Sequence, residues 1–219
     1  MKLRGGDRVV GEWRSRLAPG LAALGVRLPP GAEARLLAFT ELLLQWNQAY
    51  NLTAVRDPAE VVTKHFLDSL AVLPFVAGSP VLDVGTGAGL PGIPLALALP
   101  DTRFVLLDSN GKKTRFITHA AAVLPLPNVT VVQARIEDYR PEAPFATVLS
   151  RAFASLGDFV GLAGHACAPG GRLLAMKGTP EESELARQPA GYRVAGVHPL
   201  KVPGLDAERC VVEIRKDGD

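Results

Sequence analysis

The chain has little cysteine, no long apolar run and no strong charge of one sign. Its two cysteines, Cys167 and Cys210, lie far apart and lack CxxC spacing. This pair argues against a zinc site and a disulfide scaffold, and predicts two reduced core thiols. No stretch reaches the roughly 18 uncharged apolar residues that a membrane span needs. The basic N-terminal segment also lacks the apolar run of a signal peptide. We therefore expect a cytoplasmic protein with no metal site and no membrane partner.

Charge and composition narrow the class of protein further. The net charge is only +2, so a nucleic-acid partner would need a local basic patch rather than a global charge excess. Apolar residues make up 47% of the chain and charged residues 21%, which is typical of globular proteins and excludes a disordered chain. The 219 residues fit one large domain, or one domain with a small appendage.

The first seventy-odd residues have the pattern of helices. Between residues 32 and 48, apolar side chains recur at helical spacing. Asp57 as N-cap, Pro58 at the first helical position and Glu60 three residues after the cap form a capping box that starts a further helix. The two apolar stripes consist of Leu36, Phe39, Leu43 and Trp46 in the first helix, and of Val62, Phe66, Leu70 and Leu73 in the second.

From Pro80 onward, short apolar strands alternate with helical or loop-rich segments, which indicates a parallel sheet covered on both faces. Two late strand-like segments predict a hairpin that completes the sheet. We predict a doubly wound, mostly parallel sheet with a late antiparallel hairpin, divided into an N-terminal helical region (1–78) and a Rossmann-like domain (79–219) packed as one unit. The expected strands are 81–84, 104–107, 129–132, 146–149, 172–176, 192–199 and 210–215.

The densest signal is the segment from Val81 to Gly92, where a buried strand runs into Gly85, Gly87, Gly89 and Gly92. Glycines allow a ligand to approach the main chain closely, and this turn is where nucleotide-like ligands bind in an open α/β sheet. The alternative is that the glycines only form a tight strand-to-helix turn. The spacing matches the dinucleotide pattern GxGxxG, which by itself is weak support for a nicotinamide cofactor.

Two acidic residues bear on the choice of cofactor. Asp83 lies just before the glycines, where a pyrophosphate would meet unwelcome negative charge, whereas the ammonium and sulfonium of S-adenosylmethionine would tolerate or favour it. Asp108 ends the next strand and suits ribose hydroxyls, a role common to both cofactors. We therefore favour S-adenosylmethionine over a nicotinamide cofactor.

Basic residues recur after the predicted strands. Lys112 and Lys113 lie in the first turn of a helix, where each opposes the helix dipole at a cost of roughly 0.3–1 kcal/mol. Arg135, Arg151 and Lys177 follow the third, fourth and fifth strands. Each could be a solvated or snorkelling side chain. Their recurrence at the carboxyl ends of strands favours a patch for a polyanionic substrate.

Several segments together resemble the RsmG/GidB (glucose-inhibited division protein B) family, whose members methylate guanine N7 in small-subunit ribosomal RNA. The resemblance covers residues from about 45 to the end, and no motif matches in the first thirty. The segments are Trp46-Asn and Tyr50-Asn-Leu-Thr-Ala54, Lys64-His-Phe-Leu-Asp-Ser69, Leu82 to Pro94, Asp108-Ser-Asn-Gly-Lys-Lys113, Ser150-Arg-Ala-Phe-Ala154 and Ala175-Met-Lys-Gly178.

The resemblance implies a class I S-adenosylmethionine-dependent methyltransferase fold and methylation of one guanine in the decoding-region 530 loop of 16S rRNA. It implies that Trp46, the nearby asparagines and His65 shape a cap over the cofactor. Ile136 stands where the family often has a smaller residue. With the loop residues argued above, the expected cofactor contacts are Asp83, Gly85, Gly87, Gly89, Leu90, Asp108, Ile136, Glu137 and Arg151, and the expected RNA contacts are Lys112, Lys113, Arg135 and Lys177.

Methylation of guanine N7 needs few catalytic groups. N7 has an in-plane lone pair and no proton to lose, so no general base is required, and the enzyme contributes alignment and desolvation. We predict that Arg151 orients the base or the cofactor. The expected partner is 16S rRNA, in the small subunit or its precursor, and we expect a monomer. The rival hypotheses are the same fold acting on a small molecule or protein, an NAD-dependent oxidoreductase, and a non-enzymatic RNA-binding or assembly factor.

Overall fold

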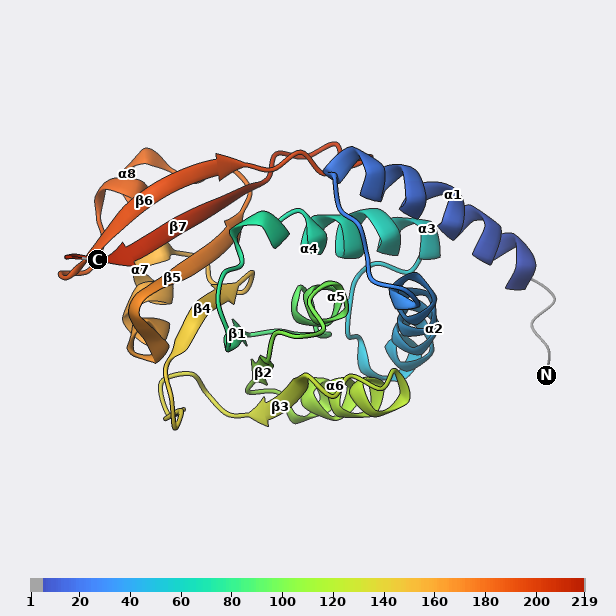
Figure 1. Cartoon of the computed structure of the whole chain (residues 1–219), viewed down its shortest axis with the longest axis horizontal. Coiled ribbons are helices and arrows are strands. Elements are labelled where there is room, and N and C mark those ends of the chain that lie inside the picture. The colour runs from blue at the N-terminus through green and yellow to red at the C-terminus, as the bar shows by residue number, and fades with distance from the viewer. Residues whose placement is uncertain (1–5, 219) are drawn as a thin grey trace.

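A computed structural model describes residues 6–218, which fold into a seven-stranded sheet with helices against both faces (Figure 1). No helix in this range is long and apolar enough to cross a membrane. The helices are α1 (Gly6–Leu24), α2 (Ala32–Tyr50), α3 (Pro58–Val61), the π-helix η1 (Val62–Leu67), α4 (Asp68–Leu70), the 3₁₀ turn η2 (Leu73–Phe75), α5 (Gly92–Ala98), α6 (Gly111–Val123), α7 (Leu156–Ala163), the 3₁₀ turn η3 (Gly164–Ala166) and α8 (Glu182–Ala186).

The sheet has the order β3-β2-β1-β4-β5-β7-β6. The five strands from β1 to β5 are parallel, and β7 runs antiparallel to both β5 and β6. The predicted parallel sheet and late hairpin are therefore confirmed. The strands are β1 (Val81–Val84), β2 (Phe104–Asp108), β3 (Val129–Gln133), β4 (Phe145–Ser150), β5 (Cys167–Lys177), β6 (Tyr192–Pro199) and β7 (Cys210–Lys216).

Successive residues of a strand contribute in turn to two hydrophobic cores, one on each face of the sheet. Val81 belongs to the core that also contains Phe39 and Phe116, from α2 and α6. Leu82 belongs to the opposite core, with Phe159 of α7. Neighbouring strand residues point to opposite faces, so each short apolar strand packs on both sides. The N-terminal helices share the first core with the sheet, while the boundary at residue 78 remains a prediction.

The segment between α2 and β1 departs from the single helix expected there. Asp57 caps α3 as predicted, since its Oδ1 accepts a hydrogen bond from the N–H of Ala59 at 2.9 Å. The carboxylate of Glu60 instead accepts a hydrogen bond from Lys64 Nζ at 2.7 Å. The helix then widens into η1, where the N–H of Asp68 bonds to the carbonyl of Thr63, five residues earlier. Spacing of apolar residues does not predict such a turn, and π-turns are frequently found at functional sites.

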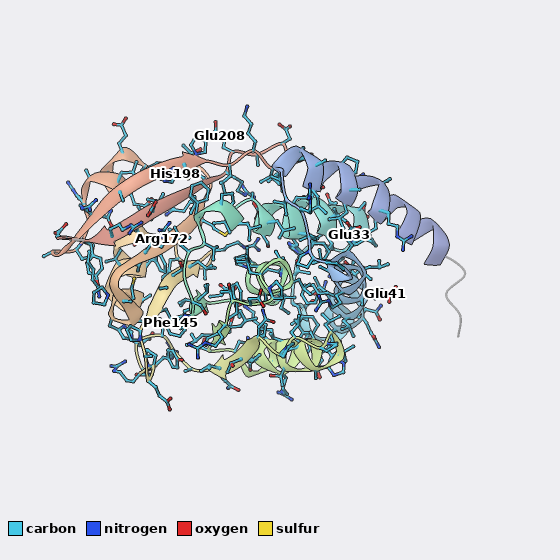
Figure 2. The ribbon with its side chains drawn as sticks, in the orientation of Figure 1. Glu33, Glu41, Phe145, Arg172, His198 and Glu208 are labelled. Atoms are coloured by element: carbon cyan, nitrogen blue, oxygen red, sulfur yellow. The ribbon has the colours of Figure 1, made fainter. Side chains whose placement is uncertain are left out.

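The two cysteines are both buried in the core that contains α7, as the sequence predicted. On the opposite face of the sheet, Glu213 of β7 lies between Arg172 of β5 and His198 of β6, the last two of which are labelled in Figure 2. Although burial opposes it, the neighbouring Arg215 guanidinium holds the pKa of Glu213 below its usual value. These contacts brace the hairpin against the parallel part of the sheet.

Candidate cofactor and RNA site

The predicted site residues lie along one edge of the sheet, where β1 to β5 end. Two residues labelled in Figure 2 help to locate this edge. Phe145 lies at the start of β4, at the amino ends of the parallel strands, and Glu208 lies beyond the end of β5, at their carboxyl ends. Glu208 lies close to the carboxyl edge because Cys210 pairs with Lys177, the last residue of β5. Ligands of open α/β sheets bind outside the carboxyl ends of the strands, at the point where the strand order reverses. Here that point lies between β1 and β4. From β1 the chain continues to β2 and β3 on one side of the sheet, and from β4 it continues to β5 on the other side.

The glycine loop follows β1 and needs glycine for two physical reasons. Gly85, Gly87 and Gly89 all have φ between 63° and 81°, a range that other residues rarely adopt. A Cβ atom on Gly85 would also lie 2.6 Å from the Cβ of Ala152, and one on Gly89 would lie 2.7 Å from Ile93 Cδ1. A side chain at any of the three positions would be strained by its φ, and one at Gly85 or Gly89 would also require a neighbouring side chain to shift.

Asp83 is fully buried beneath this loop. Its Oδ2 accepts hydrogen bonds from Thr86 Oγ1 at 2.6 Å and from the N–H of Gly92 at 2.9 Å. Its Oδ1 is buried and has no hydrogen-bond partner among the described residues. Burial raises the pKa of Asp83 to about 6. An unpartnered carboxylate oxygen costs free energy, and an ammonium group placed beside it would remove that cost.

Asp108 connects the ends of β1 and β2. Its Oδ2 accepts a hydrogen bond from the N–H of Gly87 at 2.9 Å, and its Oδ1 accepts one from the N–H of Asn110 at 2.8 Å. Each oxygen keeps a further lone pair, and 8% of the side chain is exposed. The Lys113 ammonium is 3.9 Å away. Asp108 thus fixes the loop while it remains able to accept hydrogen bonds from hydroxyl groups.

The other expected cofactor contacts lie in the segments that follow β1 and β3. Leu90 is buried in the core between the loop and α5. Ile136 is buried in the opposite core, in the turn that follows β3. Glu137 is more exposed and lines a hollow of about 580 Å³ between this turn and α7, together with Arg140. The turns after β1, β2 and β3 are neighbours because their strands are adjacent in the sheet.

Comparison with known proteins decides the family. A family model described as rRNA small subunit methyltransferase G (GidB) matches residues 32–212. The chain belongs to this family. A relative from Aromatoleum aromaticum, named ribosomal RNA small subunit methyltransferase G, is 54% identical over 206 residues, covering 92% of this chain and 98% of the relative. A relative of the same name from an Azoarcus species is 49% identical over 209 residues, covering 95% and 99%.

Solved structures with low sequence identity share the fold. The glycopeptide N-methyltransferase MtfA, solved with S-adenosylmethionine, has a TM-score of 0.57 at 15% identity, over 70% of this chain and 88% of that one. TrmN from Thermus thermophilus has a TM-score of 0.54 at 19% identity, over 71% of this chain and 53% of that one. The Rossmann-like class I methyltransferase fold predicted from the sequence is confirmed.

The basic residues of this GidB-family chain form a line rather than a single cluster. Lys112 and Arg135 lie near β2 and β3, whereas Lys177 ends β5, four strands from β3. Four strand spacings correspond to about 19 Å. Arg135 pairs with Glu137 at 3.6 Å, while Lys112 is exposed and has no ion pair within residues 6–218. The line has the dimensions of an extended anionic chain rather than those of one small anion.

Arg151 and Lys177 share a cavity of about 410 Å³ at the β5 end of this line. Arg151 Nη1 lies 2.8 Å from Asp68 Oδ2, and Arg209 Nε lies 3.1 Å from Asp68 Oδ1. Lys177 Nζ lies 2.5 Å from Glu184 Oε1 and donates to the carbonyl of Ala154. The cavity is lined by Lys64, Asp68, Arg151, Phe153, Met176, Lys177, Gly178 and Arg209.

The π-helix sets His65 beside this cavity. His65 Nε2 and Thr53 Oγ1 are 2.8 Å apart, and Nδ1 is buried without a hydrogen-bond partner in the described chain. Burial and then the charge of Arg151 lower the pKa of His65 to about 4. Asn47 holds the backbone of Thr53 through both its amide groups. The motif residues near 46–54 and His65 therefore form one neutral, hydrogen-bonded support.

Sequence reasoning assigned no role to two residues that shape the cavity. Asp68 lies within the quoted family motif, but its two arginine partners are 83 and 141 residues away. Arg209 stands in no motif that was noted, and only its nearness to the start of β7 could have suggested it. No group of three or more His, Cys, Asp or Glu side chains between residues 6 and 218 has the arrangement of a metal site.

Proposed function

We propose that this protein transfers a methyl group from S-adenosylmethionine to N7 of a guanine in the 530 loop of 16S rRNA. Relatives about half identical over almost the whole chain are named ribosomal RNA small subunit methyltransferase G. The observation that carries the proposal is the buried, unpartnered Oδ1 of Asp83 beneath an intact glycine loop. It fits the ammonium of S-adenosylmethionine and disfavours a pyrophosphate.

The residues that would hold the cofactor are those around the ends of β1, β2 and β3. Asp83 Oδ1 would accept from the cofactor's ammonium, and Asp108 would accept from the ribose hydroxyls. Gly85, Gly87 and Gly89 let the backbone approach it closely, and Leu90, Ile136 and Glu137 would flank it. S-adenosylmethionine supplies a methyl group on a positively charged sulfur.

Alignment is the main contribution of the protein to the reaction. Guanine N7 carries a lone pair and no proton, so no side chain has to remove one. Arg151 is suited to orient the reactants, because its guanidinium lines the cavity and is held in place by Asp68 at 2.8 Å. Lys112, Lys113, Arg135 and Lys177 would contact the RNA backbone. The target base would leave its stack to reach the cavity.

The test is methyl transfer from labelled S-adenosylmethionine to small ribosomal subunits and to naked 16S rRNA, with the modified base identified by mass spectrometry. We expect label in 7-methylguanosine of the 530 loop. The matched control is rRNA with 7-deazaguanosine at the target position, which keeps every edge of the base except the N7 lone pair, and no label is expected there. Label in another base or atom would contradict the proposal, and its pattern would name the true acceptor.

A further inference from the structure

We propose that Asp68 selects guanine by accepting hydrogen bonds from N1–H and the 2-amino group of the target base. This inference rests on the proposed function and assigns the part of the cavity that reads the base. Among residues 6–218, Asp68 is the one carboxylate that lines the cavity, beside the cations Lys64, Arg151, Lys177 and Arg209. Only 5% of its side chain is exposed.

The two arginines fix Asp68 without using all of its capacity. Arg151 donates to Oδ2 at 2.8 Å and Arg209 donates to Oδ1 at 3.1 Å. An ionised carboxylate has about four lone-pair sites, so each oxygen retains one. The Asp68 carboxylate is therefore held in one orientation, with Oδ1 and Oδ2 side by side as two acceptors. Binding of a base then costs little further side-chain conformational entropy.

A pair of acceptors matches guanine and no other RNA base. Guanine presents two adjacent donors, N1–H and the 2-amino group, on its Watson–Crick edge. Adenine and cytosine present a ring-nitrogen lone pair there, which the carboxylate would repel. Uracil presents a single N–H between two carbonyl oxygens. Proteins recognise unstacked RNA bases on this edge, and a carboxylate that loses its partners inside a pocket is costly.

The other walls of the cavity suit the remaining parts of the base. Phe153, whose ring lies 5.2 Å from that of Phe159, and Met176 offer apolar surfaces on which a purine can stack. The cations beside Asp68 suit O6, which adjoins N1. With the Watson–Crick edge at Asp68, N7 lies on the opposite edge of the base and stays free to receive the methyl group. The glycine loop is near, since Gly85 packs against Ala152, next to Arg151.

The test compares subunits that carry guanosine or inosine at the target position. Inosine keeps N7, O6 and N1–H and lacks only the 2-amino group. We expect the wild-type protein to prefer guanosine by at least about tenfold in kcat/KM. We expect Asp68→Asn to lower transfer to guanosine and to bring the guanosine-to-inosine ratio to one or below, because the carboxamide turns a donor toward the base.

The guanosine-to-inosine ratio of kcat/KM distinguishes recognition of the base by Asp68 from a purely structural role of this residue. Asp101→Asn removes one exposed carboxylate just before β2, at the opposite edge of the sheet, and should keep the wild-type ratio. If Asp68→Asn does not fold, Asp68→Glu replaces it, and its displaced oxygens should also lower the ratio. Equal use of both substrates by the wild type, or a wild-type ratio in the Asp68 variants, would overturn the inference. Absence of 7-methylguanosine from unmodified subunits would instead overturn the proposed function.

Discussion

Asp83 and Gly92 are joined across the glycine loop by a hydrogen bond of 2.9 Å, from the Gly92 N–H to the Asp83 carboxylate. Gly92 is the first residue of α5, and Asp83 lies in β1, so the bond closes the whole loop from within the core. A Cβ on Gly92 would lie 2.8 Å from the same carboxylate oxygen and 2.1 Å from Leu106 Cδ2. The buried charge of Asp83 is therefore tied to the geometry on which cofactor binding depends.

The first prediction concerns stability and pH in Asp83→Asn. Burial raises the pKa of Asp83 from 3.8 to about 6. The folded state thus holds a proton that the unfolded state releases between these two values. The stability of the wild type relative to Asp83→Asn should therefore fall as pH rises from about 4 to 6, by up to about 3 kcal/mol. Urea unfolding of both proteins from pH 4 to 7.5 measures this difference. Parallel curves would contradict a raised pKa.

A second prediction assigns the charge of Asp83 to the cofactor's ammonium. Asp83→Asn keeps an oxygen for Thr86 and Gly92 but removes the negative charge, so the loop should persist while affinity for S-adenosylmethionine falls about tenfold or more. Calorimetric titration at pH 7.5 measures the affinity. An analogue without the α-amino group is the matched ligand, and it should bind both proteins equally well. A tenfold difference with that analogue too would place the effect in the loop rather than in the ammonium contact.

The third prediction separates steric contact from backbone strain at Gly85. Gly85 has φ of 66° and Gly170 has φ of 70°. An alanine Cβ at 85 meets Ala152, whereas nothing lies within 4 Å at 170. Both substitutions incur the left-handed cost of about 1–2 kcal/mol, and Gly85→Ala should lose about 1–3 kcal/mol more through overpacking. Urea unfolding and cofactor titration check this, and Gly170→Ala should bind the cofactor normally. Equal losses would show that the packing against Ala152 is unimportant.

The strands and the glycine loop were predictable from sequence because both depend on local patterns. Short apolar or strand-like runs predicted β1 to β4, β6 and β7 within a residue or so. β1, β2 and β4 are apolar because they are buried on both faces, whereas β3 and β6, at the two sides of the sheet, are only partly buried. β5 begins five residues earlier than expected, at Cys167, because Cys167 also pairs with Phe145 of β4, before an irregularity in the register that precedes Arg172. Its start depends on a neighbouring strand rather than on its own residues.

Ion pairing at the carboxyl edge could not be predicted in the same way. The sequence places Arg151 and Lys177 at strand ends, but it does not show that Asp68 and Glu184 come to meet them. Asp68 directly follows the π-helix η1, and Glu184 lies in α8. Apolar patterns predict helices in such segments but do not show which polar side chains meet across the fold. For this reason the sequence predicts a basic patch for a polyanionic substrate, whereas the structure contains a partly neutralised line of cations with Lys112 as an exposed member.

The fourth prediction follows from the exposure of Lys112. Removal of one cation that contacts phosphate should lower the salt dependence of RNA binding by about 0.7 in the slope of log K against log salt for single-stranded RNA. We expect this change for Lys112→Ala on 16S rRNA, measured by filter binding over a range of salt concentrations. Arg103→Ala is the control, because Arg103 is also exposed but precedes β2 at the opposite edge. An equal change in slope for both variants would place the RNA elsewhere.

The last prediction tests Arg151 against a matched arginine. The side chains of Arg151 and Arg172 are 27% and 24% exposed, and each pairs with an acid whose own side chain is no more than 13% exposed. Arg172 lies five residues before Lys177 in β5, away from the cavity. With cofactor saturating, Arg151→Ala should slow single-turnover methyl transfer about 100-fold or more, because misplaced reactants lose alignment. Arg172→Ala should lose stability but keep its rate. A near-normal single-turnover rate in Arg151→Ala would remove Arg151 from the reaction, and the alignment would then have to come from Asp68 and the glycine loop alone.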